Sequence, residues 1–296
     1  MSNSLIKYHV PVLSEELING LVVKPKGKYI DCTLGEAGHT HAVLNSVNPA
    51  PMVLGIDLDV DALSSAKHSL ENHSKSVILV NGNFNNLKTI AAKNDFSNVD
   101  GVFFDLGLSS LQLGKEGRGF SFKTDDYLDM RFDKNQDFTA WDVINTYHEK
   151  DISRIVANYG EETKPDRIAK AIVANRPIDT TSQLSNVVIK ALKRPWSKIH
   201  PATRTFQAIR MEVNGEMENL ESALHQSQEI LNPGGRLAVI SYHSLEDRLV
   251  KKFLTQRHRE GDTLRIINKK VIKPSRTEIL SNRRSRSARM RVAERI

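Results

Sequence analysis

The sequence has few features of secreted or membrane-embedded proteins. It contains one cysteine, Cys32, so no disulfide can form within the chain, which is typical of proteins in a reducing cytoplasm. No apolar run approaches the roughly 18 residues that a membrane span needs. The first residues also lack the apolar segment of a signal peptide. We therefore expect a cytoplasmic protein without a membrane partner.

Metal-ligand spacing and internal repeats are missing as well. The ten histidines are scattered along the chain, so we expect no metal. The hydrophobic content of 39% and charged content of 26% are ordinary for a soluble globular protein. At 296 residues, one large domain with an insertion or two domains are expected. The net charge of +7 favours a polyanionic partner, although many metabolic enzymes are equally basic.

A glycine-containing turn follows the first predicted strand, which covers residues 28–30. Gly35 and Gly38 allow a tight bend and close approach of a ligand, and a helix beginning near His41 would offer unpaired N–H groups. The next predicted strand, 52–56, ends in Asp57. In nucleotide-binding α/β folds, an acid at this place accepts hydrogen bonds from ribose hydroxyls. This pattern predicts a nucleoside-binding edge.

The turn lacks the third glycine of the dinucleotide fingerprint, which disfavours a nicotinamide dehydrogenase. Asp31 stands just before the turn, where a carboxylate suits a cationic or amino ligand better than a pyrophosphate. S-adenosylmethionine has an adenosine, an ammonium and a sulfonium, so it fits this polarity. The alternative is a glycine-rich turn of any α/β domain.

Two later turns add candidate residues to the same edge. Phe84 follows the third predicted strand, 76–80, and would lie either against an adenine ring or in the core. Asp105 follows the fourth predicted strand, 99–104, and Ser109 and Ser110 come soon after it. This loop is either a reaction loop or a polar loop that caps the next helix through Ser109 or Ser110.

The alternation of strands and helices stops near residue 110. Helical patterns follow at residues 140–147, 150–159, 164–175 and 182–192. We therefore predict a mostly helical insertion, 110–205, that serves as a lid or as a substrate-recognition domain. Residues 1–109 and 206–296 would form one discontinuous methyltransferase-type domain, with a fifth strand at 236–240.

The end of the chain is dense in arginine. Six arginines between Arg283 and Arg295 predict contact with phosphates, and a solvated basic tail is the alternative. Upstream, Ser244 and Asp247 resemble a helix-capping box, and His243 is a candidate substrate contact.

Long motifs run through nearly the whole chain in one order. They are His9–Leu13, Asp31–Gly35, Gly55–Asp57, Phe104–Leu113, Arg118–Phe122, Leu128–Arg131, His200–Gln207, His243–Arg248 and Arg284–Ala288. On these motifs the chain closely resembles the bacterial 16S rRNA cytosine-N4 methyltransferases called RsmH or MraW. The resemblance implies an α/β fold, with a Rossmann-like class I methyltransferase sheet and a helical insertion. It also implies S-adenosylmethionine as cofactor and a decoding-centre cytosine of 16S rRNA in the small ribosomal subunit as substrate.

The resemblance also implies roles for individual residues. The cofactor-binding set is Gly35, Ala37, Gly38, His39, Asp57, Phe84, Asp105 and Gln112, with Asp57 on the ribose. The catalytic candidates are Asp105, Ser109 and Ser110, and the RNA-binding candidates are Arg118, Arg131, Arg204, His243, Arg284 and Arg286. No metal is required by this reaction, and a homodimer is one possible oligomeric state. Ala37 and Tyr127 depart from the family's usual glycine and proline, and alanine is expected to demand a negative φ that shifts the loop.

Methylation of an exocyclic amine requires the target base to leave its stack and lie in line with the donor. Asp105 is the best candidate to orient the amine. The Asp/Asn-Pro-Pro-aromatic motif of many DNA amino-methyltransferases is missing at this place. A second hypothesis is a non-catalytic RNA-binding or ribosome-assembly factor, which would rest on the basic segments alone.

Overall fold

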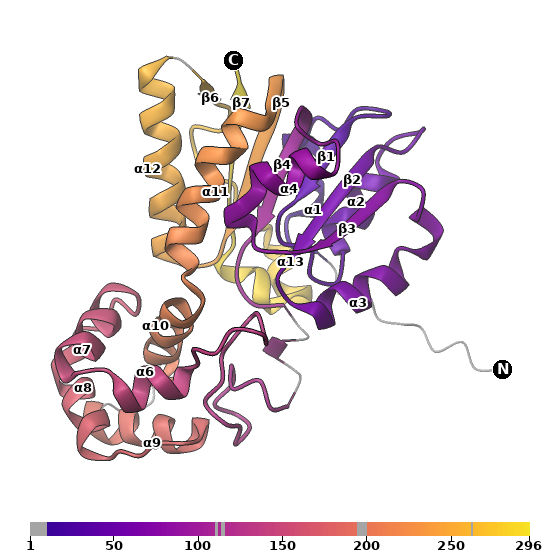
Figure 1. Cartoon of the computed structure of the whole chain (residues 1–296). Coiled ribbons are helices and arrows are strands. Elements are labelled where there is room, and N and C mark those ends of the chain that lie inside the picture. Colours follow the sequence, from indigo (N-terminus) through magenta and orange to yellow (C-terminus); the bar gives the residue numbers. More distant parts are fainter. Residues whose placement is uncertain (1–10, 110–111, 114–115, 194–199, 262) are drawn as a thin grey trace. The chain divides into compact units, whose positions relative to one another are not determined.

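The structure is a computed structural model that describes residues 11–109, 112–113, 116–193, 200–261 and 263–296 (Figure 1). The chain divides into two compact units. The sheet unit comprises Met1–Gly107 and Met217–Ile296, and the helical unit comprises Leu108–Glu216. No helix within the described ranges is long and apolar enough to cross a membrane.

A mixed seven-stranded sheet forms the centre of the sheet unit, in the order β3-β2-β1-β4-β5-β7-β6. The strands are β1 (Lys28–Asp31), β2 (Met52–Asp57), β3 (Val77–Asn81), β4 (Val99–Asp105), β5 (Leu231–Ser241), β6 (Leu264–Ile266) and β7 (Arg289–Arg295). The first five strands run parallel, and β7 pairs antiparallel with both β5 and β6. The predicted strands in the first half of the chain are confirmed to within about a residue at each end.

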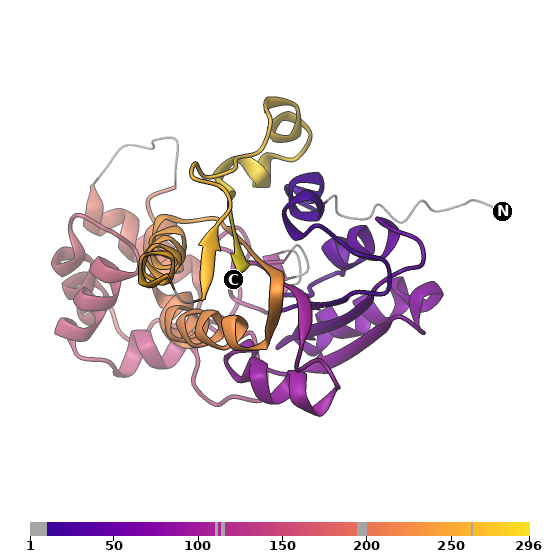
Figure 2. The ribbon, with the colours of Figure 1, turned by 90° about the horizontal axis from the view of Figure 1, so that it is seen from above.

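Helices cover both faces of this sheet (Figure 2). One face packs against α1 (Ser14–Leu21), α2 (Gly38–Asn45) and α3 (Val60–Ser69); the other packs against α4 (Leu87–Lys93), α11 (Glu216–Ile230) and α12 (Ser244–Glu260). Short elements complete the unit: η1 (Glu71–His73), η2 (Phe84–Asn86), α13 (Arg276–Ser281) and η3 (Arg283–Ser287). The apolar strands are therefore buried on both sides, as parallel strands require.

The strand order reverses between β1 and β4. From β1 the chain proceeds outward to β2 and β3, then returns to β4 on the other side and continues to β5. In open α/β sheets, ligands bind beyond the carboxyl ends of the strands at such a switch point. The turn after β1 and the residue Asp105 at the end of β4 both lie at this place.

The arginine-rich end of the chain is not a tail. Residues 289–295 form β7, which lies inside the sheet between β5 and β6. Arg289 and Arg291 pair with Asp247 at 3.1 and 2.7 Å, and Arg295 donates to the Thr263 carbonyl. The composition of this segment obscured its strand, because its alternate residues Met290 and Val292 are buried and the arginines between them are not.

The helical unit contains α6 (Ala140–Thr146), α7 (Glu149–Asn158), α8 (Pro165–Ala174), α9 (Thr181–Leu192) and α10 (Thr203–Asn214). Its boundaries, 108 and 216, differ from the expected 110 and 205. The difference arises because α10 belongs to this unit: Phe206, Ile209 and Val213 pack into its core with α6 to α9. The expected boundary had placed residues 206–214 in the other domain.

Candidate active site

Asp105 is the residue on which three other side chains converge at the switch point. Its carboxylate accepts a hydrogen bond from the Tyr242 hydroxyl at 2.8 Å, and its other oxygen lies 3.4 Å from His39 Nδ1. Its backbone N–H donates to Thr33 Oγ1 at 2.6 Å. With 27% of the side chain exposed, the carboxylate is held from β1, α2 and β5 and still reaches solvent. Such an arrangement fixes an acceptor without burying it.

The protonation of Tyr242 makes this arrangement stable. Burial raises the pKa of the Tyr242 phenol, and the neighbouring Asp105 carboxylate raises it further. The hydroxyl therefore keeps its proton throughout the physiological range and donates to Asp105. His39 is held from its other side, since its Nε2 donates to the Val12 carbonyl at 2.8 Å.

The turn after β1 is built from two left-handed residues. Gly35 has φ +52°, and Ala37 has φ +64° at the N-cap of α2. The expectation that Ala37 demands a negative φ is therefore wrong. The left-handed conformation costs alanine roughly 1–2 kcal/mol, and the fully buried Ala37 keeps it because its N–H donates to the Leu34 carbonyl and its own carbonyl accepts from His41.

Asp57 fastens this turn to the end of β2. Its Oδ2 accepts from the Gly35 N–H at 2.7 Å, and its Oδ1 accepts from the Asp59 N–H at 2.9 Å. Burial raises the pKa of Asp57 to about 6, although these backbone hydrogen bonds oppose the shift. Each carboxylate oxygen has two lone pairs, so an ionised Asp57 can still accept from the hydroxyls of a ribose.

Asp31 turns inward instead of toward a ligand. Only 1% of it is exposed, and its oxygens accept from the Thr33 N–H at 3.1 Å and the Thr40 hydroxyl at 2.7 Å. Burial raises its pKa to about 6, against the effect of the Thr40 hydrogen bond. The expectation that this carboxylate attracts the cationic end of a ligand is thus replaced by a role in holding the turn and the start of α2.

Phe84 begins η2 beyond the end of β3. Its ring meets Phe104 edge to face, with the centroids 5.7 Å apart, and it packs partly buried against the sheet core. The ring therefore belongs partly to the core and keeps a part of its surface outside it. Both of the proposed positions for Phe84 are compatible with this half-buried packing.

Ser109 and Gln112 bond to each other within the helical unit. The Ser109 N–H donates to Gln112 Oε1 at 3.0 Å, and the Gln112 N–H donates to Ser109 Oγ at 3.1 Å. This reciprocal pair matches the capping alternative for the loop. Ser110 lies outside the described residues, as does His9. The catalytic role of Ser109 and the cofactor contact of Gln112 stay predictions.

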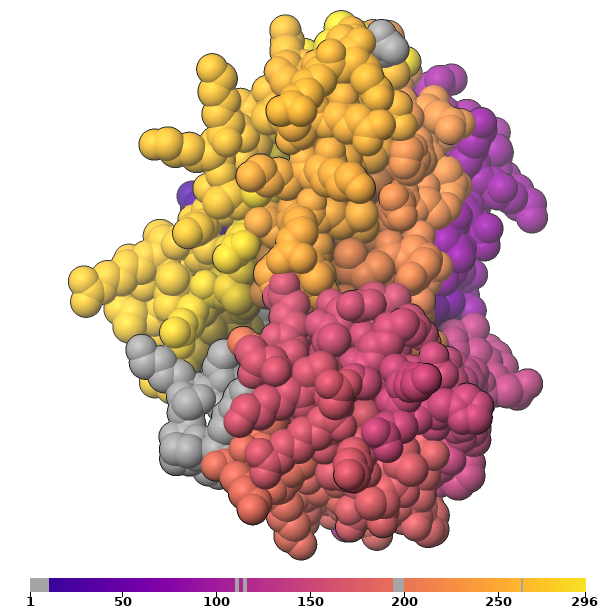
Figure 3. Space-filling model, turned by 90° about the vertical axis from the view of Figure 1, so that its left-hand side faces the viewer, coloured from indigo at the N-terminus to yellow at the C-terminus, as the bar shows by residue number. Residues whose placement is uncertain are grey.

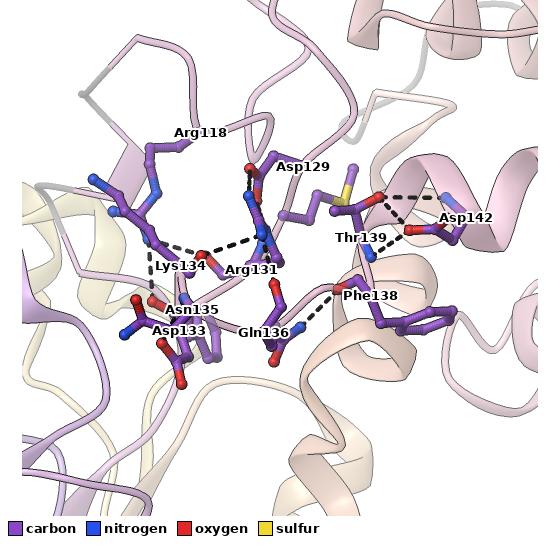
Figure 4. A network of polar contacts seen from close by, with 12 residues as sticks. Arg118, Asp129, Arg131, Asp133, Lys134, Asn135, Gln136, Phe138, Thr139 and Asp142 are labelled. Atoms are coloured by element: carbon purple, nitrogen blue, oxygen red, sulfur yellow. Dashed lines mark hydrogen bonds and ion pairs between the residues drawn. The ribbon is translucent and has the colours of Figure 1, made fainter.

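Three of the arginines predicted to bind RNA make contacts within the helical unit, and Figure 4 shows two of them, Arg118 and Arg131. Arg131 forms a two-pronged ion pair with Asp129, at 3.0 and 2.7 Å, and also donates to the Gln136 carbonyl. Arg118 is 5% exposed and donates to the Arg131 carbonyl at 3.0 Å. Arg204 donates to the Glu161 carbonyl at 3.0 Å. Their structural contacts are clear, and their contact with RNA stays a prediction.

His243, Arg284 and Arg286 lie in the sheet unit. His243 is the N-cap of α12, paired in a capping box with Glu246, so the predicted cap at Ser244 and Asp247 is wrong by one residue. Asp247 is not available for capping because it binds Arg289 and Arg291. Arg284 and Arg286 are exposed on η3.

Two supporting residues of the site were not identified from sequence. Neither Thr33 nor Tyr242 received a role, yet both bind Asp105. The signal that could have identified them is strand adjacency: β1 and β5 flank β4, so residues just beyond their carboxyl ends lie beside Asp105.

Comparison with known proteins identifies the family of this chain. The model of the MraW methylase family matches residues 7–296. The chain belongs to the MraW methylase family. A ribosomal RNA small subunit methyltransferase H of Dehalococcoides mccartyi is 49% identical, covering 97% of this chain and 86% of its own length. Proteins with the same name from Fervidobacterium nodosum and Caldicellulosiruptor bescii are 45% and 42% identical, covering 98% and 97% of this chain and 98% and 99% of their own lengths.

Membership of the MraW methylase family confirms the predicted fold class, the methyltransferase activity and the cofactor S-adenosylmethionine. The residues present fit that cofactor. Asp57 provides acceptors for a ribose, Phe84 provides a partly buried aromatic ring, and the carboxylate of Asp105 suits a positively charged sulfonium or ammonium. Which atoms of the cofactor each residue contacts stays a prediction.

Proposed function

We propose that this MraW family member transfers the methyl group of S-adenosylmethionine to the exocyclic N4 of a decoding-centre cytosine in 16S rRNA. The observation that carries the proposal is the fixed, partly exposed carboxylate of Asp105 at the switch point, in a chain 49% identical to a ribosomal RNA small subunit methyltransferase H. A ribosomal substrate also agrees with the expected cytoplasmic location.

Bound S-adenosylmethionine supplies an activated methyl group on a sulfonium. In the transfer, the bond from carbon to sulfur breaks, the bond from carbon to N4 forms, and one amine hydrogen leaves as a proton. The N4 lone pair is conjugated into the cytosine ring, so the amine is a weak nucleophile and needs accurate alignment. The part of Asp105 is to accept a hydrogen bond from the amine and hold its lone pair toward the methyl group.

Other residues of the chain contribute by holding Asp105 and the methyl donor in this alignment. Tyr242 and Thr33 fix Asp105, and the turn from Gly35 to Gly38 with Asp57 fixes the nucleoside of the donor. The helical unit, 108–216, is proposed to recognise the RNA around the target base. Arg284 and Arg286, both exposed, are proposed to bind its phosphates.

The test compares small-subunit RNA from cells with and without the protein by mass spectrometry of nucleosides. We expect one N4-methylated cytosine to disappear from the decoding centre in cells that lack the protein. Complementation with Asp105→Asn should not restore it. An unchanged modification pattern together with intact RNA binding would favour the non-catalytic assembly factor.

A further inference from the structure

A one-sided row of cations runs along α12. Arg248, Lys251, Lys252 and Arg259 are all exposed, and their spacing places them on one side of the helix. The opposite side carries Val250, Phe253 and Leu254, which are buried in the sheet core. Together with Thr255, the four cations line one surface hollow. Figure 3 shows this outer face of α12, orange in the upper half of the view.

Within the described part of the chain, the acids of α12 form no ion pair with Lys251, Lys252 or Arg259. Glu246 accepts from the backbone N–H of Tyr242, and Asp247 pairs with Arg289 and Arg291. Glu260 also borders the hollow, but its carboxylate pairs with Arg257 at 2.7 Å. Among the described residues, Lys251, Lys252 and Arg259 form no ion pair with a carboxylate within 4.0 Å. The row therefore presents positive charge to solvent.

Folding alone does not favour such a row. Like charges three or four residues apart on a helix repel by about 0.2–0.5 kcal/mol per pair. Arg248 forms two such pairs, with Lys251 and Lys252. Acids near Arg248 would remove this repulsion, so the cations at this end of the row weaken the helix. Arg259 lies in the last turn, where a cation is favourable.

The row also begins beside the candidate site. α12 starts directly after β5, at the capping residue His243, and the preceding residue is Tyr242, which holds Asp105. From Arg248 to Arg259 the row extends about 16 Å at the helical rise per residue. A polyanion bound along it would therefore lead from the carboxyl edge of the sheet along one side of the sheet unit.

We infer that this face of α12 binds the phosphate backbone of the RNA whose base enters the site. The inference rests on the proposed function and extends it, because neither the arginines of the C-terminal segment nor those of the helical unit belong to this surface. Arginine and lysine on one helical face recognise phosphates through charge and carry no sequence information. The row contributes to the affinity for RNA and to its orientation, and the site around Asp105 selects the base.

The test uses the full chain and two variants with equal loss of charge. The row variant is Arg248→Gln, Lys251→Gln, Lys252→Gln and Arg259→Gln. The matched control replaces four exposed lysines elsewhere in the sheet unit: Lys26→Gln, Lys67→Gln, Lys75→Gln and Lys93→Gln. Affinity for protein-free small-subunit RNA is measured between about 50 and 200 mM salt, where phosphate contacts dominate the salt dependence.

We expect the slope of log K against log salt to fall by roughly 0.7–0.9 for each lost phosphate contact, so by about 3 in the row variant and by less than about 1 in the control. S-adenosylmethionine affinity should be unchanged in both. The double variant Lys251→Gln/Lys252→Gln should give about half of the effect. It provides the readout if the fourfold variant folds poorly by circular dichroism.

Equal slopes for the row variant and the control would overturn the inference. Weaker binding to the assembled subunit with unchanged binding to free RNA would also overturn it, since the partner of α12 would then be a ribosomal protein. Neither result would contradict the proposed function. That function is tested separately, by measuring methyl transfer from the wild-type protein to the same RNA.

Discussion

The Tyr242 hydroxyl donates a hydrogen bond to Asp105 at 2.8 Å across the ends of neighbouring strands β5 and β4. This contact joins two motifs that are far apart in the sequence. It gives Asp105 a fixed direction while more than a quarter of its side chain stays exposed, at 27%. The reactivity of the proposed site depends on this orientation.

Tyr242→Phe removes the donor and preserves the ring. We expect kcat for methyl transfer to fall roughly fivefold, because a lost hydrogen bond of about 1 kcal/mol loosens the acceptor. The affinity for S-adenosylmethionine should stay nearly constant. The matched control is Tyr29→Phe, whose hydroxyl accepts from the Lys24 N–H away from the site and should affect stability alone. Equal kcat values for wild type and Tyr242→Phe would remove Tyr242 as a positioning residue.

Prediction from sequence succeeded where pattern and chemistry coincide. The strand that leads to Asp57 is a short apolar run, and such runs define the parallel half of the sheet and its functional edge. Prediction was unsuccessful where the hydrogen-bond or strand partner of a residue is recognisable only in the folded chain. Asp31 was expected to suit a cationic ligand, but it accepts a hydrogen bond from Thr40. The arginines at the end of the chain were expected to contact phosphates, but Arg289, Arg291 and Arg295 lie in β7, between β5 and β6.

The proposed contact of Asp57 with the ribose should make cofactor binding depend on pH. Its folded pKa is about 6, and the hydroxyls of a ribose donate to the ionised form. Below that pH a proton must leave before the ligand binds, so affinity should fall by up to about tenfold per pH unit and be flat above about pH 7. Asp57→Asn should bind more weakly and lose this pH dependence, as measured by calorimetry. A wild-type affinity that is constant from about pH 5 to about pH 7 would contradict the assignment.

Asp31 should make stability depend on pH in the opposite sense to an acid in a salt bridge. Its pKa is about 6 in the folded chain and about 4 in the unfolded chain. Between these values the folded state keeps a proton that the unfolded state releases, so the free energy of unfolding falls as pH rises from about 4 to 6.

The size of this effect is at most about 3 kcal/mol. Asp31→Asn preserves the acceptor for Thr33 and can donate to the Thr40 hydroxyl. It should therefore remove the part of the slope that Asp31 contributes between about pH 4 and 6 and leave the part from Asp57, whose pKa is also about 6. Urea denaturation of both proteins across this range is the measurement. Parallel profiles would show that Asp31 does not titrate in this window.

Arg131 has a structural role in the helical unit that can be tested without removing its positive charge. Arg131→Lys keeps the positive charge but loses the two-pronged contact with Asp129 and the bonds to carbonyls. We expect a loss of about 2 kcal/mol in the stability of the helical unit. The control Arg154→Lys alters an exposed pair at 3.8 Å and should change stability by less than about 0.5 kcal/mol. Unchanged thermal unfolding of Arg131→Lys would refute the structural role.

The central claim is that the edge around Asp105 methylates N4 of a cytosine in small-subunit RNA. The most direct measurement incubates the purified protein with small ribosomal subunits and isotope-labelled S-adenosylmethionine, and then identifies the labelled nucleoside by mass spectrometry. The account predicts label on the N4 of a single decoding-centre cytosine and none with Asp105→Asn. Label on another base or on a ring carbon, or full transfer by Asp105→Asn, would contradict it.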